Sequence, residues 1–152
     1  MKSGKYECPF CKLVVQDRIV SSNELAFAIY DQYPVSKGHL LVIPKRHCDN
    51  YFLLSSEEQQ GCWTLIQEMQ ERIANDFHPD GFNIGINVGE SAGQTVGHVH
   101  VHLIPRYDGD MKDPRGGVRH CVEGKGYYLS NSLILKSQKA KSDTNLKESI
   151  LQ

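Results

Sequence analysis

Short apolar runs of β-prone residues recur along this chain on either side of one long amphipathic segment. Residues 25–30 are apolar, as are residues 39–44 apart from His39, whereas residues 82–88 alternate apolar with polar side chains. Runs of this length and composition predict strands. We expect further strands at 19–20 and along the alternating histidines that begin at residue 98.

The amphipathic segment carries the signals of a helix over about residues 56–77. Ser55 followed three residues later by Glu58 forms a capping box, which marks a helix start. Apolar residues then recur at helical spacing and define one face: Cys62, Leu65, Ile66, Met69 and Ile73. Trp63 flanks this face, and we expect it to pack in the core. Strands, one long helix and more strands predict an α+β fold with the helix on one sheet face.

Composition narrows the classes of partner. The chain has 152 residues, enough for one domain with a real core, and a net charge of −1. A net charge this small gives no long-range electrostatic attraction, so neither nucleic acid nor a membrane surface is an expected partner. No signal-like start or membrane-length apolar run is present. The cysteines are odd in number and scattered, which favours reduced thiols and a cytoplasmic location: Cys8, Cys11, Cys48, Cys62 and Cys121.

Three alternating histidines carry the strongest chemical signal. In a strand, His98, His100 and His102 share one face, and the intervening apolar residues point into a core. Imidazole transfers protons near neutral pH, and it also serves as a nucleophile or a metal ligand. A catalytic metal held by all three is the weaker hypothesis, because the third histidine reaches poorly to one ion. His39 begins an apolar strand and could face the same cleft.

The segment just before the histidines is rich in glycine. Gly89, Gly93 and Gly97 would let backbone N–H groups converge on an anion, with Gln94 and Thr95 as further donors. A plain hairpin connection is the alternative.

The pair Cys8-x-x-Cys11 has the spacing of half a zinc site. His47 and His98 are the available further ligands, and a closed four-ligand site would be structural. The alternatives are a redox pair, although no βαβ pattern follows, and two unrelated buried thiols.

Together these residues resemble the histidine-triad (HIT) family of nucleotide hydrolases and transferases. The family motif, His-φ-His-φ-His-φ-φ with φ apolar, matches all of residues 98–104. The likeness extends through GQTV at 93–96, INVG at 86–89 and PVSKGHLLVIPKRH at 34–47, and spans roughly residues 8–119. It implies an antiparallel sheet of about five strands with one long helix, and a homodimer that extends the sheet.

The resemblance also assigns roles to residues. His100 would attack the α-phosphorus of a nucleoside phosphate derivative and form a covalent nucleotidyl-histidine, which water then releases. His102 would contact phosphate oxygens, as would Asn87, Gln94 and Thr95, and Asp31 would bind ribose hydroxyls. Zinc-bearing members imply the ligand set Cys8, Cys11, His47 and His98.

Two questions stay open at this point. If His98 binds zinc, it cannot also be the general acid, so His39 or the leaving phosphate must manage the proton. A divalent ion could also arrive with the substrate phosphates. The basic residues Arg106, Lys112, Arg115 and Arg119 resemble the branch that cleaves dinucleoside polyphosphates, although a solvated charged loop explains them equally well.

The expected domain covers residues 1–128, with a zinc-binding amino-terminal segment at 1–17, and a C-terminal extension or tail follows at 129–152. The leading functional hypothesis is a hydrolase that acts on dinucleoside polyphosphates or related adenosine nucleotides. The alternatives are a nucleotidyltransferase and a nucleotide-binding or scaffold protein with vestigial hydrolysis. A zinc module for nucleic acid is disfavoured, because the charge is neutral and basic runs interleaved with aromatics are lacking.

Overall fold

A computed structural model describes residues 8–12 and 17–128 of the chain. The chain divides into two compact units after Lys112, whereas the sequence suggested a boundary after residue 128. The tail predicted at 129–152 and most of the segment at 1–17 lie outside the described residues. Within the described residues, no helix is long and apolar enough to cross a membrane.

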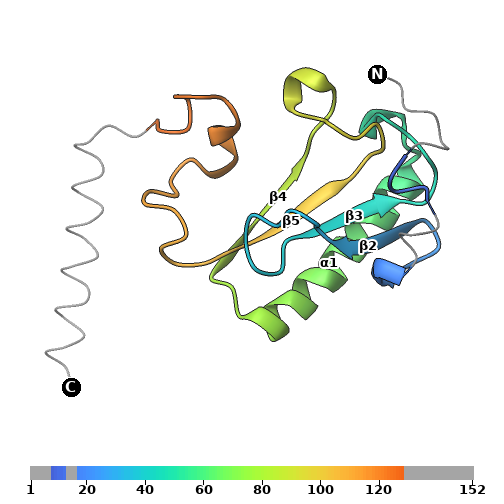
Figure 1. Ribbon diagram of the computed structural model, residues 1–152, viewed down its shortest axis with the longest axis horizontal. Helices are drawn as coiled ribbons and strands as arrows, with labels where there is room; N and C mark the ends of the chain where they lie inside the picture. The colour runs from blue at the N-terminus through green and yellow to red at the C-terminus, as the bar shows by residue number, and fades with distance from the viewer. Residues whose placement is uncertain (1–7, 13–16, 129–152) are drawn as a thin grey trace, which may run out of the picture. The chain divides into compact units, whose positions relative to one another are not determined.

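The first unit is built on one antiparallel sheet with the long helix α1 (Ser56–Phe77) along one face (Figure 1). The order across the sheet is β1 (Ile19–Ser22), β2 (Ala26–Tyr30), β3 (Leu40–Pro44), β5 (Val101–Arg106) and β4 (Gly81–Ile86). This arrangement confirms the predicted α+β fold with five strands and one helix, and the helix has the predicted bounds. Strands β4 and β5 form the expected antiparallel pair.

The two central strands β2 and β3 are buried on both faces, which explains their continuous apolar sequence. One face packs against α1 through small and branched side chains such as Ala28, Val42 and Leu103. The other face carries a separate apolar cluster: Phe27, Ile29, Leu41 and Ile43. A second hydrophobic cluster therefore lies on the face of the sheet opposite α1.

The apolar face of α1 is buried as predicted, but Trp63 is not part of it. Its side chain is 41% exposed, and its Nε1 donates a hydrogen bond to the Tyr51 hydroxyl at 3.1 Å. The expectation of core packing is wrong here, because Trp63 lies at the edge of the face, over the turn at residues 51–53.

Strand β5 begins at Val101, so the prediction of one strand through all three histidines is wrong. Before it, the backbone N–H of Val99 donates to the Cys48 carbonyl and that of His98 donates to the Val96 carbonyl. These bonds belong to a loop and turn His98 and His100 away from strand geometry. The apolar residues between the histidines are nevertheless buried, with Val99 in a small cluster of its own and Val101 in the main core.

The capping box at the start of α1 also ties the helix to the end of β3. Ser55 Oγ accepts from the Glu58 N–H, and the Glu58 carboxylate accepts from the Ser55 N–H at 2.8 Å. The same carboxylate receives Nε and Nη2 of Arg46 at 2.6 and 2.7 Å. The hydrogen bonds from Arg46 lower the pKa of Glu58 to about 2, so the carboxylate is charged at neutral pH.

The second unit is described through residue 128 and contains a short 3₁₀ helix, Gly117–Cys121. The His120 ring lies against the Tyr127 ring at 4.8 Å between centroids, and its Nε2 donates to the Arg115 carbonyl. A Cβ at Gly126 would collide with this ring, so glycine is required there.

Replacing Ser55 with alanine tests the helix cap. Ser55→Ala should lower the free energy of unfolding by about 1 kcal/mol, because an N–H in the first turn loses its acceptor. Urea unfolding measures the change. Ser56→Ala, one exposed residue further on, is the control and should stay within about 0.5 kcal/mol of the native protein. Equal losses in both variants would contradict the assignment of the cap.

Candidate active site and metal centre

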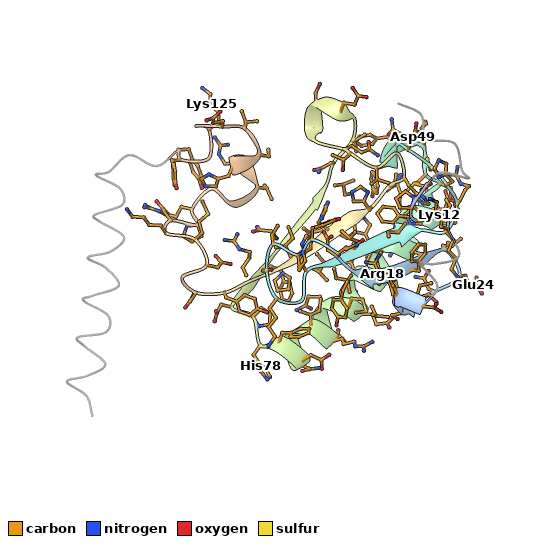
Figure 2. All side chains as sticks on the ribbon, viewed as in Figure 1. Lys12, Arg18, Glu24, Asp49, His78 and Lys125 are labelled. Atoms are coloured by element: carbon orange, nitrogen blue, oxygen red, sulfur yellow. The ribbon has the colours of Figure 1, made fainter. Side chains whose placement is uncertain are left out.

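Three histidines gather where β3 and β5 lie side by side. His39 precedes β3 and His102 lies in β5, and their ring centroids are 5.2 Å apart. His100 follows at 5.1 Å from His102. His102 pairs with Leu41, whose side chain belongs to the apolar cluster on the face opposite α1. The site therefore lies on the face of the sheet opposite α1, the helix that ends beside His78 (Figure 2).

A backbone carbonyl fixes the tautomer of His100. Nδ1 lies 2.8 Å from the carbonyl oxygen of His98, which can only accept, so Nδ1 carries the proton. Nε2 is then left with a lone pair. Among the described residues, every fully buried side-chain nitrogen or oxygen has a hydrogen-bond partner. Nε2 of His100 has no such partner, so this atom is not fully buried. Nε2 of His100 is thus reachable from solvent and is free to act as a nucleophile.

The backbone N–H of Val35 sets the tautomer of His39, and His39 in turn sets the tautomer of His102, which is opposite to that of His100. The Val35 N–H donates to Nδ1 of His39 at 3.2 Å, so the proton of neutral His39 lies on Nε2. That N–H points at Nδ1 of His102, 3.0 Å away. His102 must accept at Nδ1 and therefore carries its own proton on Nε2. The neighbouring rings thus offer complementary groups, a lone pair on His100 and an N–H on His102.

Burial keeps this network neutral. Desolvation lowers the pKa of His102, and together with the neighbouring histidines it brings the value to about 4. Desolvation also lowers the pKa of His39, although the Asp31 carboxylate, 3.5 Å from Nε2, opposes the shift. At neutral pH both rings are uncharged, so the deduced tautomers apply.

The structure brings the four predicted metal ligands together. The ligand atoms of Cys8, Cys11, His47 and His98 all lie within 4.8 Å of one another. Three sulfur-to-Nδ1 distances fall at 3.3, 3.4 and 3.5 Å. In a tetrahedral zinc site, bonds of about 2.3 Å to sulfur and 2.0 Å to nitrogen give a similar separation of about 3.5 Å.

The tautomer of His98 also suits a metal. Its Nε2 donates to the Pro44 carbonyl at 2.8 Å, which leaves the lone pair of Nδ1 facing the two cysteine sulfurs. A backbone partner on the second ring nitrogen is the usual way in which ligand histidines are oriented. The residues present therefore fit a closed site with two thiolates and two imidazoles.

Asp31, His39 and His102 also lie close enough to be considered as metal ligands. Their hydrogen bonds argue against that role. Nε2 of His39 must carry a proton while Nδ1 accepts from Val35, so it has no lone pair to give. These three residues are better described as a proton-bearing network than as a metal site.

The glycine-rich loop is held in place by Gln94, one of the residues predicted to bind phosphate. Gln94 Oε1 accepts from the Gly89 N–H at 2.7 Å, and Nε2 donates to the Asp49 carbonyl at 2.8 Å. Gly89 and Gly93 have φ of +86° and +84°, a region that favours glycine. Asn87 Nδ2 makes a long contact of 3.4 Å with the Gly93 carbonyl, and Thr95 is exposed. Direct phosphate contact by Gln94 stays a prediction.

The predicted basic residues mostly have partners within their own unit. Arg106 forms a two-point ion pair with Asp110 at 2.7 Å for both contacts. In the second unit, Arg115 pairs with Asp113, and Arg119 lies over the Tyr128 ring. Contact with distal phosphates is therefore not the only explanation for these arginines.

Sequence reasoning missed Phe10, whose ring contacts two of the site histidines. The centroid distances are 5.9 Å to His98 and 5.4 Å to His100, both edge-to-face. The available signal was its place between the two cysteines. It also missed the backbone groups of Val35 and Pro44, because main-chain partners leave no mark in a sequence motif.

Sequence comparison finds relatives of this chain among known proteins. A bis(5'-adenosyl)-triphosphatase from Dictyostelium discoideum is 39% identical over 101 residues, which cover 66% of this chain and 68% of the relative. An AP-4-A phosphorylase from Mycobacterium tuberculosis is 37% identical over 93 residues, 60% of this chain and 48% of that protein. This chain thus matches about half of the phosphorylase.

Solved structures share the fold. A Zn-bound histidine triad family protein from Mycobacterium smegmatis superposes with a TM-score of 0.65 at 35% identity, covering 72% of this chain and 82% of that one. The family model described as the HIT domain matches residues 12–109, well over half of the chain. With the motif, the fold and this match in agreement, the chain belongs to the histidine-triad (HIT) family.

Proposed function

We propose that this chain cleaves dinucleoside polyphosphates or related adenosine nucleotides at the α-phosphorus, through a covalent intermediate on His100. The observation that carries the proposal is the pair of complementary tautomers, with a solvent-accessible lone pair on His100 beside an N–H on His102. Membership of a family with a triphosphatase and a phosphorylase supports a nucleotide anhydride as the substrate class.

In the first step, Nε2 of His100 attacks the α-phosphorus. A P–N bond forms while the bond from phosphorus to the bridging oxygen breaks, and the leaving polyphosphate takes the electron pair. The Nε2–H of His102 stabilises charge on a phosphoryl oxygen. The His98 carbonyl, which accepts from Nδ1, stabilises the positive charge that develops on the His100 ring.

In the second step, water attacks the same phosphorus and the P–N bond breaks. His100 leaves as a neutral imidazole, and the proton lost by water passes to solvent or phosphate. His98 faces the metal site and is not the general acid. His39 donates to His102, so it acts on the leaving group only through that ring. If no proton reaches the leaving group by this route, the polyphosphate departs as its anion.

The other proposed substrate contacts are inferred from where the residues lie in the fold. Asn87, Gln94 and Thr95 lie on or beside the glycine-rich loop and would bind phosphate, together with any divalent ion that accompanies it. The Asp31 carboxylate, whose Oδ1 accepts from the Tyr33 N–H, would bind ribose hydroxyls.

We propose that Cys8, Cys11, His47 and His98 hold zinc. The measured separations and the free lone pair on His98 Nδ1 support this choice, as does the Zn-bound relative of known structure. A closed site of four protein ligands supplies structural stabilisation. It would hold the amino-terminal segment against the loop that carries His100.

Two alternatives keep some support. The phosphorylase relative favours nucleotidyl transfer, in which phosphate replaces water in the second step. Product analysis with and without added phosphate separates the two reactions. A nucleotide-binding protein with vestigial hydrolysis would bind adenosine nucleotides tightly without turnover.

We also propose a homodimer that extends the sheet through β4. This strand is an edge of the described sheet, and its Ile84 is 37% exposed. Unpaired strand edges pair readily with another chain.

Removing the nucleophile tests the proposed reaction. His100→Ala should lower turnover of a diadenosine polyphosphate by at least about 10³-fold, because no other group can form the intermediate. Native protein quenched under alkaline denaturing conditions should carry one adenylyl group by intact mass spectrometry. His78→Asn, at the exposed end of α1, is the control and should retain activity. Undiminished turnover by His100→Ala would refute the mechanism.

Changing one cysteine tests the metal centre. Cys11→Ser should lose most of the zinc that copurifies with the native protein, because a thiolate ligand is replaced by a poor one. Elemental analysis gives the ratio of zinc to protein. Cys121→Ser removes an exposed thiol of the second unit and should keep the native ratio. Equal zinc in both variants would rule out the assigned ligands.

The lowered pKa of His102 predicts a pH dependence of stability. Between about pH 6.5 and about pH 4 the unfolded chain binds a proton at this residue and the folded chain does not. The free energy of unfolding should therefore fall as the pH falls through this window. His102→Asn should show a shallower fall in urea unfolding at a series of pH values. An unchanged slope would mean that burial does not hold the ring neutral.

A charge on β4 tests the dimer. Sedimentation should show a dimer for the native chain and a shift towards monomer for Ile84→Lys, because lysine at a strand edge opposes pairing. Ile19→Lys is the matched control, since Ile19 has the same exposure of 37% on the opposite edge strand β1. If only Ile19→Lys dissociates the dimer, the interface lies elsewhere.

A further inference from the structure

Phe10 lies inside the metal-binding turn and also touches the proposed nucleophile. The turn is closed by a hydrogen bond from the Cys11 N–H to the Cys8 carbonyl at 3.1 Å. Because the proposed ligands Cys8 and Cys11 lie on either side of it in the motif, the backbone of Phe10 is fixed when both sulfurs bind one ion. Its part-buried ring packs on the apolar cluster of Phe27 and Ile29.

Two of the contacts of the His100 ring come from segments that carry the proposed metal ligands. The carbonyl that accepts from its Nδ1 belongs to His98, a proposed ligand. The edge-to-face contact at 5.4 Å comes from Phe10. The remaining ring neighbour is His102, at 5.1 Å. The hydrogen bond defines which nitrogen is protonated, but one bond leaves the ring free to tilt about it. The Phe10 ring restricts that tilt.

The geometry points to Phe10 as a positioning residue that couples the metal centre to His100. When the metal is bound, the turn presses the Phe10 ring against the imidazole and keeps Nε2 aimed at the phosphorus. When the metal leaves, the turn relaxes and the His100 ring gains freedom. This inference rests on the proposed function for its kinetic consequence, whereas the ring order itself can be measured without any substrate.

Misplacing a reacting atom by about 1 Å can cost about 100-fold in rate. Phe10→Leu keeps an apolar side chain over Phe27 and Ile29 but removes the aromatic edge. It should lower kcat by about 10- to 100-fold with KM changed less than about threefold, and zinc content should stay native. Phe10→Tyr retains the ring and should restore most of kcat. Phe82→Leu, a part-buried phenylalanine on the helix side of the sheet, controls for the loss of a ring elsewhere.

The second readout is the NMR line width of the His100 imidazole in substrate-free protein. In native protein the line should be sharp with metal and broadened after chelation, with circular dichroism confirming that the fold persists. In Phe10→Leu it should be broadened already with metal present, and chelation should add little. Such non-additivity is the mark of coupled groups.

The outcomes separate the two proposals. A sharp His100 line in metal-loaded Phe10→Leu, or a raised KM with native kcat, would overturn the positioning role. A native protein that turns over no adenosine polyphosphate, but shows the expected line widths, would refute the proposed function and leave the coupling of Phe10 to His100 in place.

Discussion

One hydrogen bond underlies the chemistry of this site, from Nδ1 of His100 to the carbonyl of His98. A carbonyl oxygen can only accept, so this bond determines which nitrogen of His100 is basic. The same principle orients His98 through the Pro44 carbonyl and His39 through the Val35 N–H. Main-chain groups thus assign a different task to each imidazole, although the side chains are chemically identical.

The fold supplies these main-chain groups at the right places. Strand β3 is buried on both faces, His39 and Pro44 lie at its two ends, and Val35 lies in the loop before it. The late start of β5 matters equally. It frees the backbone at His98 and His100 from the ladder, so that one ring faces the cysteines and the next contacts Phe10 and His102. A continuous strand could not divide the histidines in this way.

The sequence predicted the helix, the five strands and the four residues that gather as candidate metal ligands, because periodicity and ligand spacing are visible in the chain. It failed where long-range main-chain contacts decide the outcome. The bond from Val99 to the Cys48 carbonyl delays β5 and carries no sequence signal. Trp63 has the spacing of a core residue but contacts Tyr51 at the surface. Gln94, expected at phosphate, also braces its own loop through Gly89 and Asp49.

The tautomers of the histidines give the most direct test. Side-chain ¹⁵N shifts recorded near neutral pH distinguish the protonated from the unprotonated nitrogen of each ring. We expect the proton on Nδ1 in His100 and on Nε2 in both His39 and His102. A proton on Nε2 of His100 would remove the lone pair proposed to attack phosphorus, and would contradict the assignment of this ring as the nucleophile.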